Sequence, residues 1–516
     1  MTNAAASAPG SAIGDILAWL HAEAPAAQLS SDSRTVRTGD VFFAYPGDAA
    51  DGRKYIEQAV ANGASAVVYE AEEFAWNDAW GVPHLAVPKL KQLAGPIANA
   101  YYEQPDGGMF AVAVTGTNGK TSCTQWLGKA LSGLGQPTAV IGTLGVGLFQ
   151  RGKHAGFNAT GYTTPDAVIL QRALAQLRDR GARALAIEAS SIGIDQGRLN
   201  GMHVDVALFT NFTRDHLDYH GDMAAYEAAK RALFDWPGLR HAVINLDDDM
   251  GLRLVKHLQA SRPTVAITGY TVAGRRQEGI AVISAGDIRM QHGGTAFRLE
   301  SDAGSAQVKT QLVGQFNVSN ALGIFGVLRA KGIAFKASAD ALEALTPVPG
   351  RMEQMGGQDA PLIVIDYAHT PDALEKTLAS LRQVAQQRGG QLWCVFGCGG
   401  DRDPGKRPQM GAVAQAADHV IVTSDNPRSE EPAAILSQIV AGIDQSRLAK
   451  EALHVIEDRA AAILWAGRHA AKNDVVLLAG KGHESYQEIK GKKLPFLDAD
   501  HAALALAARA TMKGMM

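Results

Sequence analysis

The sequence predicts a three-domain α/β protein. Its 516 residues exceed what one hydrophobic core organises, and roughly 150 residues per domain suggest three domains. From about residue 104 onward, short apolar runs alternate with helical patterns, which is typical of mostly parallel sheets with crossover helices. Breaks near residues 104 and 347 divide the chain into segments 1–103, 104–346 and 347–516. We expect a small N-terminal α/β domain, a central domain with a mostly parallel sheet, and a C-terminal doubly wound domain.

The composition indicates a soluble protein whose function lies in local sites. Charged residues make up 20% of the chain and the formal net charge is -3, so neither nucleic acid nor an anionic membrane is indicated as a partner. No apolar run reaches the roughly 18 residues of a membrane span, and residues 1–14 lack the basic start of a signal peptide. We expect an unexported cytoplasmic protein, with Cys123, Cys394 and Cys398 as buried thiols.

Residues 1–103 indicate a small α/β unit without an obvious ligand. Helices are expected around residues 13–22 and 55–62, and strands at 40–44 and 66–69, with a glycine-containing loop at 46–52. Ser31, Ser33 and Arg34 fit an ordinary polar turn as well as a binding site.

Residues 116–122, Gly-Thr-Asn-Gly-Lys-Thr-Ser, follow an apolar β-prone run and lead into a helical pattern. A strand, a glycine loop and a helix in this order are typical of a triphosphate site, because amides at the helix start point at the anion. Lys120 can reach the outer phosphates, and the Thr121 hydroxyl can bind magnesium. The loop is shorter than the general pattern, since Val114 stands where its first glycine would be. A tight glycine turn with a solvated lysine is the alternative.

Three polar clusters follow apolar strands in the central segment. They occupy residues 162–166, residues 187–191 with Gln196 and Arg198 beyond, and residues 209–221. Because parallel strands end at one edge of a sheet, we expect these clusters to form a metal and substrate rim beside the glycine loop. The alternatives are a pairing of Glu188 with a lysine and a solvated turn for the histidine-rich cluster.

Other central features are less decisive. Lys230 lies in a helical pattern, where lysines are usually exposed, and local sequence does not assign it a role. Residues 265–313 predict antiparallel strands at the sheet edge, and a helix after Gly314 has an asparagine available as its cap. Capping explains one of Asn317 and Asn320, but it does not need both.

The C-terminal segment predicts a second doubly wound sheet. Four buried-type strands end in polar loops at residues 366–371, 397–403, 424–428 and 479–484.

Taken together, these loops resemble the Mur ligase family, ATP-dependent enzymes of peptidoglycan synthesis that add amino acids to a UDP-linked muramoyl peptide. The resemblance covers essentially the whole chain and depends on the combination of residues 116–121, 214–218, 366–371 and 480–484. It implies a UDP-binding N-terminal domain, a P-loop ATPase-like central domain and a Rossmann-like, amino-acid-binding C-terminal domain. It also implies small-molecule partners only, no membrane insertion, and a monomer.

The resemblance assigns roles residue by residue. Catalytic roles are implied for Lys120, Glu188, His216, Lys230 and Arg351, and Mg²⁺ ligation for Thr121, Glu188, His216 and Lys230, the last as a carbamate. ATP, the co-substrate, is expected at Gly116, Thr117, Asn118, Gly119, Lys120, Thr121, Ser122, Asn317, Asn320, Arg351 and Asp366. The UDP-muramoyl peptide is expected at Ser31, Ser33, Asp48, Ala49, Ala50, Thr163, Thr164, Ser190, Gln196 and Arg198. Tyr162 and Ile192 depart from the residues expected of the family beside these positions.

The stretch Asp425-Asn426-Pro427-Arg428 indicates which amino acid is added. meso-Diaminopimelate differs from lysine by a second carboxylate. An arginine guanidinium binds a carboxylate with two parallel hydrogen bonds, so Arg428 with Arg402 suits that substrate. The resemblance implies that Asp425, Asn426, Pro427, Gly480 and Glu484 complete the pocket. We expect an acid–amino-acid ligase that adds meso-diaminopimelate to UDP-N-acetylmuramoyl-L-alanyl-D-glutamate through an acyl phosphate. A lysine-adding ligase, a folylpolyglutamate-type ligase and a nucleotide-binding module without catalysis are the alternatives.

Overall fold

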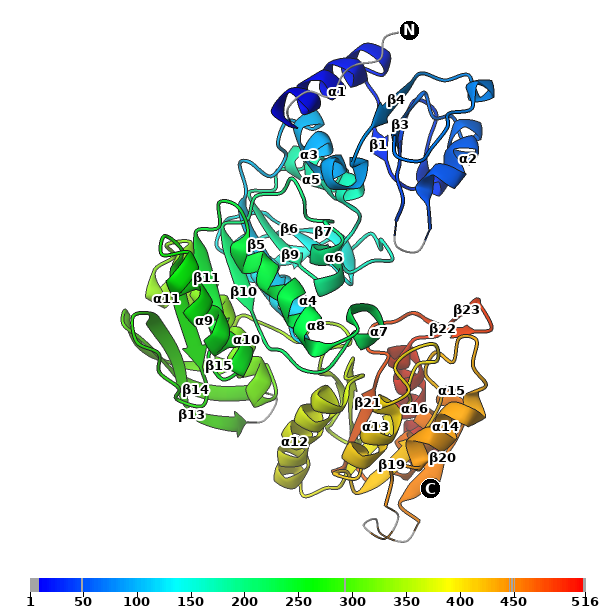
Figure 1. The fold of residues 1–516 in the computed structure, drawn as a ribbon. Coiled ribbons are helices and arrows are strands. Elements are labelled where there is room, and N and C mark those ends of the chain that lie inside the picture. Colours follow the sequence, from blue (N-terminus) through cyan, green and yellow to red (C-terminus); the bar gives the residue numbers. More distant parts are fainter. Residues whose placement is uncertain are drawn as a thin grey trace.

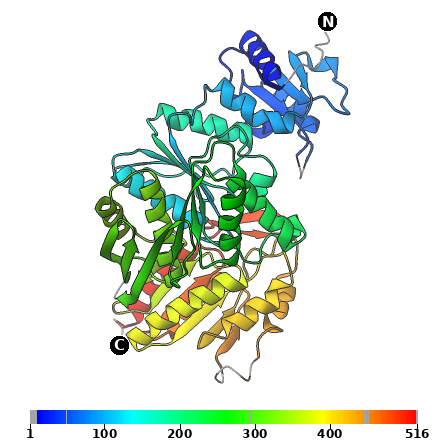
Figure 2. The ribbon, with the colours of Figure 1, turned by 60° about the vertical axis from the view of Figure 1, so that its left-hand side comes forward.

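The computed structural model describes residues 9–47, 50–291, 294–444, 446, 449 and 451–513. The chain forms three lobes in sequence order, and the N-terminal lobe projects from one end while the other two lie against each other (Figures 1 and 2). No helix within the described part of the chain is long and apolar enough to cross a membrane. Cys123, Cys394 and Cys398 are buried free thiols, as predicted.

The N-terminal domain is a four-stranded parallel sheet with helices around it. Its elements are α1 (Pro9–Glu23), β1 (Leu29–Ser30), β2 (Val41–Ala44), α2 (Ile56–Ala61), β3 (Ala66–Glu70), β4 (His84–Val87) and α3 (Leu90–Tyr101). The strands pair in sequence order. The sequence indicated α1, α2, β2 and β3 but not β1, β4 or α3. β4 is mostly exposed, so it lacks the apolar signal of a buried strand.

The central domain is organised by an eleven-stranded sheet with the order β15-β14-β13-β12-β11-β10-β5-β9-β6-β7-β8. Its strands are β5 (Phe110–Thr115), β6 (Thr138–Gly142), β7 (Gly145–Gln150), β8 (Lys153–His154), β9 (Ala184–Glu188), β10 (Val206–Phe209), β11 (His241–Asn245), β12 (Ala266–Thr271), β13 (Ala281–Gln291), β14 (Gly294–Ser301) and β15 (Gly304–Thr310). The strands from β13 to β6 are parallel to one another, which confirms the mostly parallel sheet.

The predicted antiparallel edge is only partly correct. β14 pairs antiparallel with β13 and β15, but β12 is parallel to β11, and β13 is parallel to β12. The connection between β12 and β13 crosses over, so that the two strands run parallel instead of forming a hairpin. Its first residues are held by Asp247, which follows β11 and whose carboxylate accepts hydrogen bonds from Thr271 Oγ1 (2.6 Å) and Val272 N (2.7 Å). The local pattern of short, glycine-containing strands does not show that a carboxylate distant in sequence holds the end of β12 in place.

Helices cover both faces of this sheet. They are α4 (Lys120–Gly133), α5 (Ala167–Asp179), α6 (Ser191–Asp195), α7 (Leu217–His220), α8 (Met223–Arg231), α9 (Asp249–Ser261), α10 (Gln315–Ala330) and α11 (Phe335–Glu343). Alternate residues of β5 belong to two separate cores: Val112 and Val114 pack with α4 and α10, and Ala111 and Ala113 pack with α5 and α9. The predicted asparagine cap of α10 is wrong, because Gly314 occupies the N-cap and Asn317 Nδ2 donates to Val313 O (2.9 Å) from inside the helix.

The C-terminal domain contains a six-stranded sheet with the order β16-β17-β21-β18-β19-β20. Its elements are β16 (Glu353–Gly356), β17 (Leu362–Asp366), α12 (Pro371–Arg388), β18 (Leu392–Phe396), α13 (Lys406–Ala414), β19 (His419–Val422), α14 (Pro432–Val440), β20 (Leu453–Val455), α15 (Arg459–His469), β21 (Val475–Ala479) and α16 (Asp498–Lys513), with a hairpin of β22 (Tyr486–Ile489) and β23 (Lys492–Pro495). Within the six-stranded sheet, all strand pairs are parallel except β16 with β17. The four predicted strands are β17, β18, β19 and β21, and two cores flank them, as expected of a doubly wound sheet.

A histidine between two carboxylates joins the N-terminal and central domains. His203 Nδ1 lies 3.1 Å from Asp106 Oδ2, and its Nε2 lies 3.2 Å from Asp205 Oδ2. Asp106 also accepts a hydrogen bond from Asn99 Nδ2 of α3 (3.0 Å). Hydrogen bonding to Asp106 and then to Asp205 raises the pKa of His203 from 6.5 to about 10.

This cluster predicts a stability difference that depends on pH. Because the folded-state pKa of His203 is raised, its protonation stabilises the fold fully below pH 6.5, and the contribution is lost as pH rises toward about 10. We therefore expect His203→Gln to lower the urea midpoint most below pH 6.5, with a difference from wild type that shrinks steadily toward pH 10. A difference that stays constant over this range would contradict the assignment.

Candidate active site

The glycine loop joins β5 to α4 at the carboxyl edge of the central sheet. Gly116 has φ +151°, and a Cβ there would lie 1.9 Å from Thr210 Oγ1. Gly119 has φ +86° at the N-cap of α4. The loop is fixed from β10, because Thr210 Oγ1 donates to Asn118 O (2.6 Å) and Asn211 Oδ1 accepts from Asn118 N (2.9 Å). The strand, loop and helix predicted from the sequence are therefore present, and both glycines are sterically required.

Two lysine side chains converge on this loop. Lys120 Nζ donates to Gly116 O (2.8 Å) and Thr117 O (2.9 Å), and Lys230 Nζ donates to the same Gly116 O (3.0 Å). Lys230 is 1% exposed and lies 4.4 Å from the ring centroid of Tyr226. The expectation that Lys230 is exposed is therefore wrong, because α8 packs against the loop. The alternative of a freely solvated Lys120 is wrong as well, because its amine donates to two loop carbonyls.

Burial has the same electrostatic effect on both amines. It lowers the pKa of Lys120, and it lowers the pKa of Lys230 well below its usual value, with the Lys120 charge adding to the effect. A lysine with a strongly lowered pKa has a larger share of neutral, nucleophilic amine.

The Glu188 carboxylate lies next to the loop because β9 pairs with β5, with Val114 opposite Glu188. It accepts hydrogen bonds from Thr121 Oγ1 (3.1 Å), Thr143 N (2.8 Å) and Thr143 Oγ1 (3.1 Å). Sequence reasoning missed Thr143, since no local pattern distinguishes it. The Glu188 side chain is buried among hydroxyl and amide donors, and no lysine donates a hydrogen bond to it among the described residues.

The histidine-rich cluster bridges the central and C-terminal domains. Asp215 Oδ2 lies 3.6 Å from His216 Nε2 and 3.8 Å from His369 Nε2, and Arg214 pairs with Asp403 (3.1 Å). Burial lowers the pKa of His216 to about 4, so its ring is neutral near pH 7 and can ligate a metal. Burial opposes ionisation of Asp215, but His369 and His216 hold its pKa below the usual range. The cluster is thus an ordered domain contact, and a freely solvated turn is excluded.

The residues around Thr121 and Glu188 fit a magnesium ion. Both provide hard oxygen donors, which Mg²⁺ prefers, and their hydrogen bond joins the first turn of α4 to the end of β9. Among the described residues, no three His, Cys, Asp or Glu side chains form a group that could hold a metal by themselves.

A cavity of about 600 Å³ lies between the central and C-terminal domains, beside the glycine loop. Of the residues predicted to bind ATP, those lining it are Asn118, Gly119, Ser122, Asn317, Asn320, Arg351 and Asp366. Arg351 Nη2 donates to Thr121 Oγ1 (3.1 Å), whereas its buried Nε has no hydrogen-bond partner among the described residues. An unpartnered guanidinium nitrogen next to a glycine loop suits a phosphate oxygen.

Asp366 is held rigidly at the wall of this cavity. Its carboxylate accepts hydrogen bonds from Met352 N (2.8 Å) and Ala368 N (2.9 Å), and burial raises its pKa.

The residues predicted to bind the acceptor peptide form one hydrogen-bonded group. Thr163 bonds to Thr143 (3.1 Å between hydroxyls), and Thr164 bonds to Ser190 (2.9 Å). Arg198 Nη1 donates to Thr164 O (2.8 Å) and its Nε donates to Gln196 Oε1 (2.8 Å). Tyr162, one of the departures from the family, is 51% exposed with its ring centroid 5.1 Å from the Arg198 guanidinium carbon. Ile192, the other departure, lies within α6.

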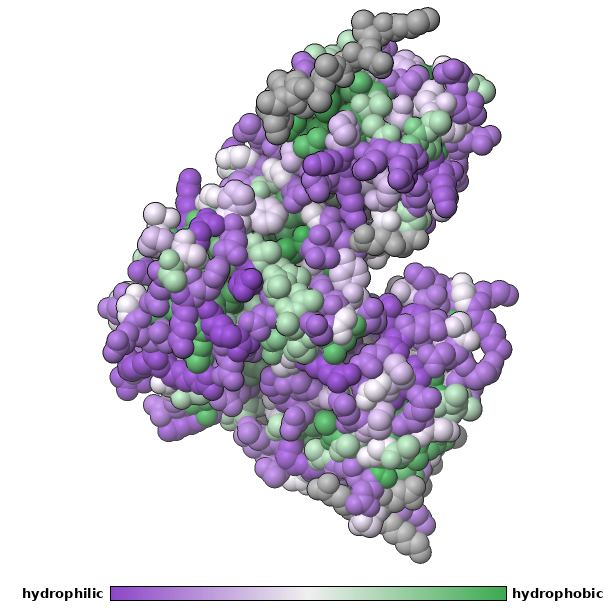
Figure 3. Space-filling model, in the orientation of Figure 1, coloured by the Kyte–Doolittle hydropathy of each residue, from purple (hydrophilic) through white to green (hydrophobic). Residues whose placement is uncertain are grey.

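The predicted UDP-binding residues are less closely grouped. Ser31 Oγ donates to Asp166 of the central domain (2.6 Å), whereas Ser33 is buried and donates to Gln58 (3.0 Å) inside the N-terminal domain. Of the predicted loop residues Asp48, Ala49 and Ala50, only Ala50 is among the described residues. A hydrophilic notch opens between the N-terminal and C-terminal domains at the right of Figure 3.

The predicted amino-acid pocket lies at the carboxyl ends of the C-terminal strands. Arg428, at φ +52°, donates from Nη1 to Gly400 O (2.7 Å), and its Nε lies 3.7 Å from Glu488 Oε2 of β22. Arg402 and Arg428 flank Gly399, where a Cβ would lie 2.8 Å from Arg428 Nη1 and 3.8 Å from Arg402 Cγ. The O atom of Pro427 packs so closely on Gly400 that only glycine fits there.

The other predicted pocket residues meet at Asn426. Its Nδ2 donates to Glu484 Oε2 (2.7 Å), and its Oδ1 accepts from the fully buried Lys481 (3.3 Å). Asp425 is buried beside Gly480, where a Cβ would lie 2.6 Å from Asp425 Oδ2. Lys481 was not assigned from the sequence, although it lies within the Gly-Lys-Gly-His-Glu motif.

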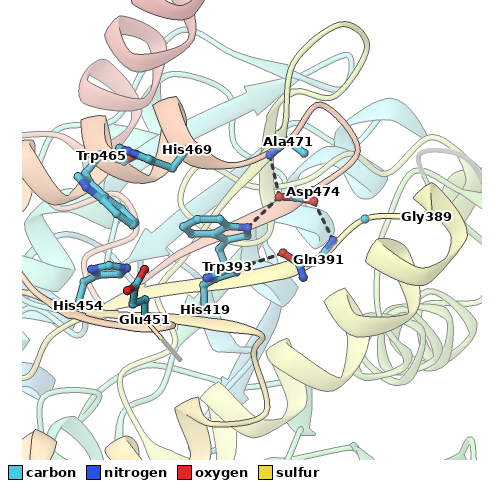
Figure 4. Close-up of a pocket in the computed structure, with 11 residues that line it drawn as sticks. Gly389, Gln391, Trp393, His419, Glu451, His454, Trp465, His469, Ala471 and Asp474 are labelled. Carbon is cyan, nitrogen blue, oxygen red and sulfur yellow. Dashed lines mark hydrogen bonds between the residues drawn. The ribbon is translucent and has the colours of Figure 1, made fainter. Parts of the chain in front are cut away.

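Two further cavities lie away from this chemistry. One of about 650 Å³ is lined by Trp393 and His419, stacked at 3.9 Å, with Trp465 and His469 across from them (Figure 4). It lies at the amino ends of β18 and β19, opposite the edge that carries Arg428. The other, of about 590 Å³, lies beside His203.

Three domain families match successive parts of the chain. The Mur ligase family catalytic domain matches residues 26–102, the Mur ligase middle domain matches 114–328, and the Mur ligase glutamate ligase domain matches 350–482. The chain belongs to the Mur ligase family.

Individual Mur ligases resemble the chain over nearly its whole length. It is 69% identical to the UDP-N-acetylmuramoyl-L-alanyl-D-glutamate–2,6-diaminopimelate ligase of Janthinobacterium sp. (strain Marseille), over 96% of this chain and 97% of that protein. The ligase of the same name from Ralstonia nicotianae is 52% identical over 96% of each chain. A solved structure of a ligase of that name is 39% identical, covers 94% of this chain and 95% of its own, and superposes with a TM-score of 0.64.

Gly142 offers a steric test of the site. A Cβ there would lie 2.2 Å from Glu188 Oε1 and 2.7 Å from its Cγ, so Gly142→Ala must displace the carboxylate. We expect ATP-dependent turnover to fall about 100-fold, the cost typical of a catalytic group misplaced by about 1 Å. Gly133→Ala is the matched control, because nothing lies within 4 Å of its added Cβ. Equal turnover of Gly142→Ala and wild type, at equal urea midpoints, would contradict the assigned role of Glu188.

Proposed function

We propose that the chain is an ATP-dependent acid–amino-acid ligase that adds meso-diaminopimelate to UDP-N-acetylmuramoyl-L-alanyl-D-glutamate. The observation that carries this proposal is the position of Arg351 of the C-terminal segment, which donates to Thr121 of the glycine loop and lines a cavity of about 600 Å³. The names of relatives 69% and 52% identical support the choice of substrates.

The reaction proceeds in two steps. An oxygen of the D-glutamyl γ-carboxylate attacks the γ-phosphorus of ATP, ADP leaves, and an acyl phosphate forms. The neutral amine of diaminopimelate then attacks the acyl carbon, and inorganic phosphate leaves as the amide forms. No nucleophile of the protein is needed, so catalysis rests on positioning and on charge stabilisation.

The residues of the glycine loop stabilise the transferring phosphoryl group. Lys120 moves from the loop carbonyls to the phosphate oxygens, and Arg351 directs its unpartnered Nε at the same charge. Thr121, Glu188 and His216 would hold Mg²⁺, which would neutralise charge on the phosphate oxygens. The lowered pKa of Lys230 favours attack of its neutral amine on carbon dioxide, with loss of one proton to solvent, and the resulting carbamate would provide an anion beside Lys120 and a further oxygen donor for the metal.

The C-terminal pocket selects the amino acid. Arg428 and Arg402 bind the distal carboxylate that lysine lacks, and Asp425 and Glu484 bind the ammonium group at the same end of the molecule. The lysine-adding alternative offers the two arginines no substrate carboxylate to bind. We further propose that the enzyme works as a monomer, because one chain supplies every assigned residue. We also propose that it works in the cytoplasm.

Amino-acid-dependent phosphate release tests this function. With ATP, Mg²⁺ and the UDP-linked acceptor, we expect release to require meso-diaminopimelate and to be negligible with lysine. Arg428→Ala should raise the KM for meso-diaminopimelate by about 30-fold or more, the effect of truncating one partner of a buried charge pair, and leave the KM for ATP unchanged.

Arg382→Ala is a matched control, because this arginine pairs with Asp418 on the same domain, away from the pocket. Equal rates with lysine and meso-diaminopimelate in the wild type would overturn the proposed substrate. An unchanged KM in Arg428→Ala would overturn the role of this arginine only.

A further inference from the structure

One carboxylate, that of Asp166, receives hydrogen bonds from both sides of the junction between the N-terminal and central domains. Ser31 Oγ donates to its Oδ1 (2.6 Å), and Tyr45 OH donates to its Oδ2 (2.6 Å). Both donors belong to the N-terminal domain. Asp166 itself is the N-cap of α5, and its Oδ1 also accepts from Val168 N (3.0 Å).

The surroundings of Asp166 make these contacts persistent. Burial raises the pKa of Tyr45 well above its usual value, so its hydroxyl remains protonated and donates. Val168 and Ala175 of α5 belong to the core of the N-terminal domain, and α3 and α5 lie side by side at the junction (Figure 1). The N-terminal domain is therefore docked on α5, with Asp166 at the end of that helix nearest to the acceptor site.

The turn before α5 leads directly to the catalytic carboxylate. Thr163 bonds to Thr143, whose hydroxyl donates to Glu188 Oε2, and Thr164 Oγ1 donates to Glu188 O (2.7 Å). Asp166 follows these threonines in the same turn. A displacement of the N-terminal domain would therefore move Asp166, the two threonines and the bound acceptor together.

We propose that Asp166 is a positioning residue that fixes the N-terminal domain relative to the threonine turn, so that both ends of the UDP-linked acceptor are held in register with the glycine loop. This inference rests on the proposed function. Asp166 contacts neither ATP nor the reacting atoms in this assignment. It acts through Ser31 and Tyr45 on one side and through Thr163 and Thr164 on the other.

The acceptor is long and has to be held at two domains at once. Fixing these domains before binding removes an ordering cost that would otherwise weaken acceptor binding. Loss of the contact should therefore appear in the KM for the acceptor, while the chemical step at saturating acceptor remains nearly unchanged.

Asp166→Asn separates this role from helix capping. Asparagine caps a helix as well as aspartate does, but it is uncharged and its amide nitrogen cannot accept a hydrogen bond, so the charge-assisted bond that Tyr45 OH donates is lost. We expect the KM for the UDP-linked acceptor to rise about tenfold, with kcat within about threefold of wild type and the KM for ATP unchanged. Tyr45→Phe should raise the same KM similarly.

The two substitutions should not be additive, because they remove the same contact. Asp458→Asn is the matched control, because Asp458 caps α15 through Ala461 N (2.8 Å), has no partner in another domain among its described hydrogen bonds, and should leave the acceptor KM unchanged. An unchanged acceptor KM in Asp166→Asn, a fall in kcat without a KM change, or full additivity with Tyr45→Phe would overturn the proposal. A wild type without acceptor-dependent phosphate release would instead overturn the proposed function.

Discussion

The contact between Thr121 and Glu188 is the interaction on which the rest of the site depends. Thr121 begins the helix that follows the glycine loop, and Glu188 ends the neighbouring parallel strand, so the sheet itself brings the two together. Thr121 also accepts a hydrogen bond from Arg351, and Glu188 accepts two from Thr143. Residues from different elements, predicted to bind the nucleotide, the metal and the acceptor, therefore meet around one hydroxyl and one carboxylate.

The electrostatics of the loop follow from the same packing. Lys120 and Lys230 donate to a single carbonyl oxygen, that of Gly116. Burial lowers the pKa of each amine, and the Lys120 charge lowers that of Lys230 further, so two positive charges at this position are costly. An anion between or beside them, whether a phosphate oxygen or a carbamate on Lys230, converts this repulsion into attraction. The site is thus organised for negative charge before a substrate arrives.

The sequence predicted the features that depend on local pattern. The glycine loop, several buried strands of both large sheets (β5, β9, β10, β17, β18, β19 and β21) and the polar clusters at their ends are visible because β-strands, turns and helix starts have short-range signatures. The parallel course of β12 and β13, the burial of Lys230 and the contact of Asp215 with His369 depend on how distant segments pack. For the same reason Thr143 was not predicted, and Asp166 and Lys481 were included in polar clusters without a role of their own. Their partners Thr163, Ser31 and Asn426 lie between 20 and 135 residues away.

Transfer of oxygen from the acceptor to phosphate tests most directly whether the loop phosphorylates the acceptor carboxylate. The acceptor would be prepared with ¹⁸O in its γ-carboxylate, and the inorganic phosphate released during ligation would be analysed by mass spectrometry. An acyl phosphate requires that each phosphate released carries one oxygen from that carboxylate, so labelled phosphate is predicted. Unlabelled phosphate, with all of the ¹⁸O outside the phosphate, would contradict the account.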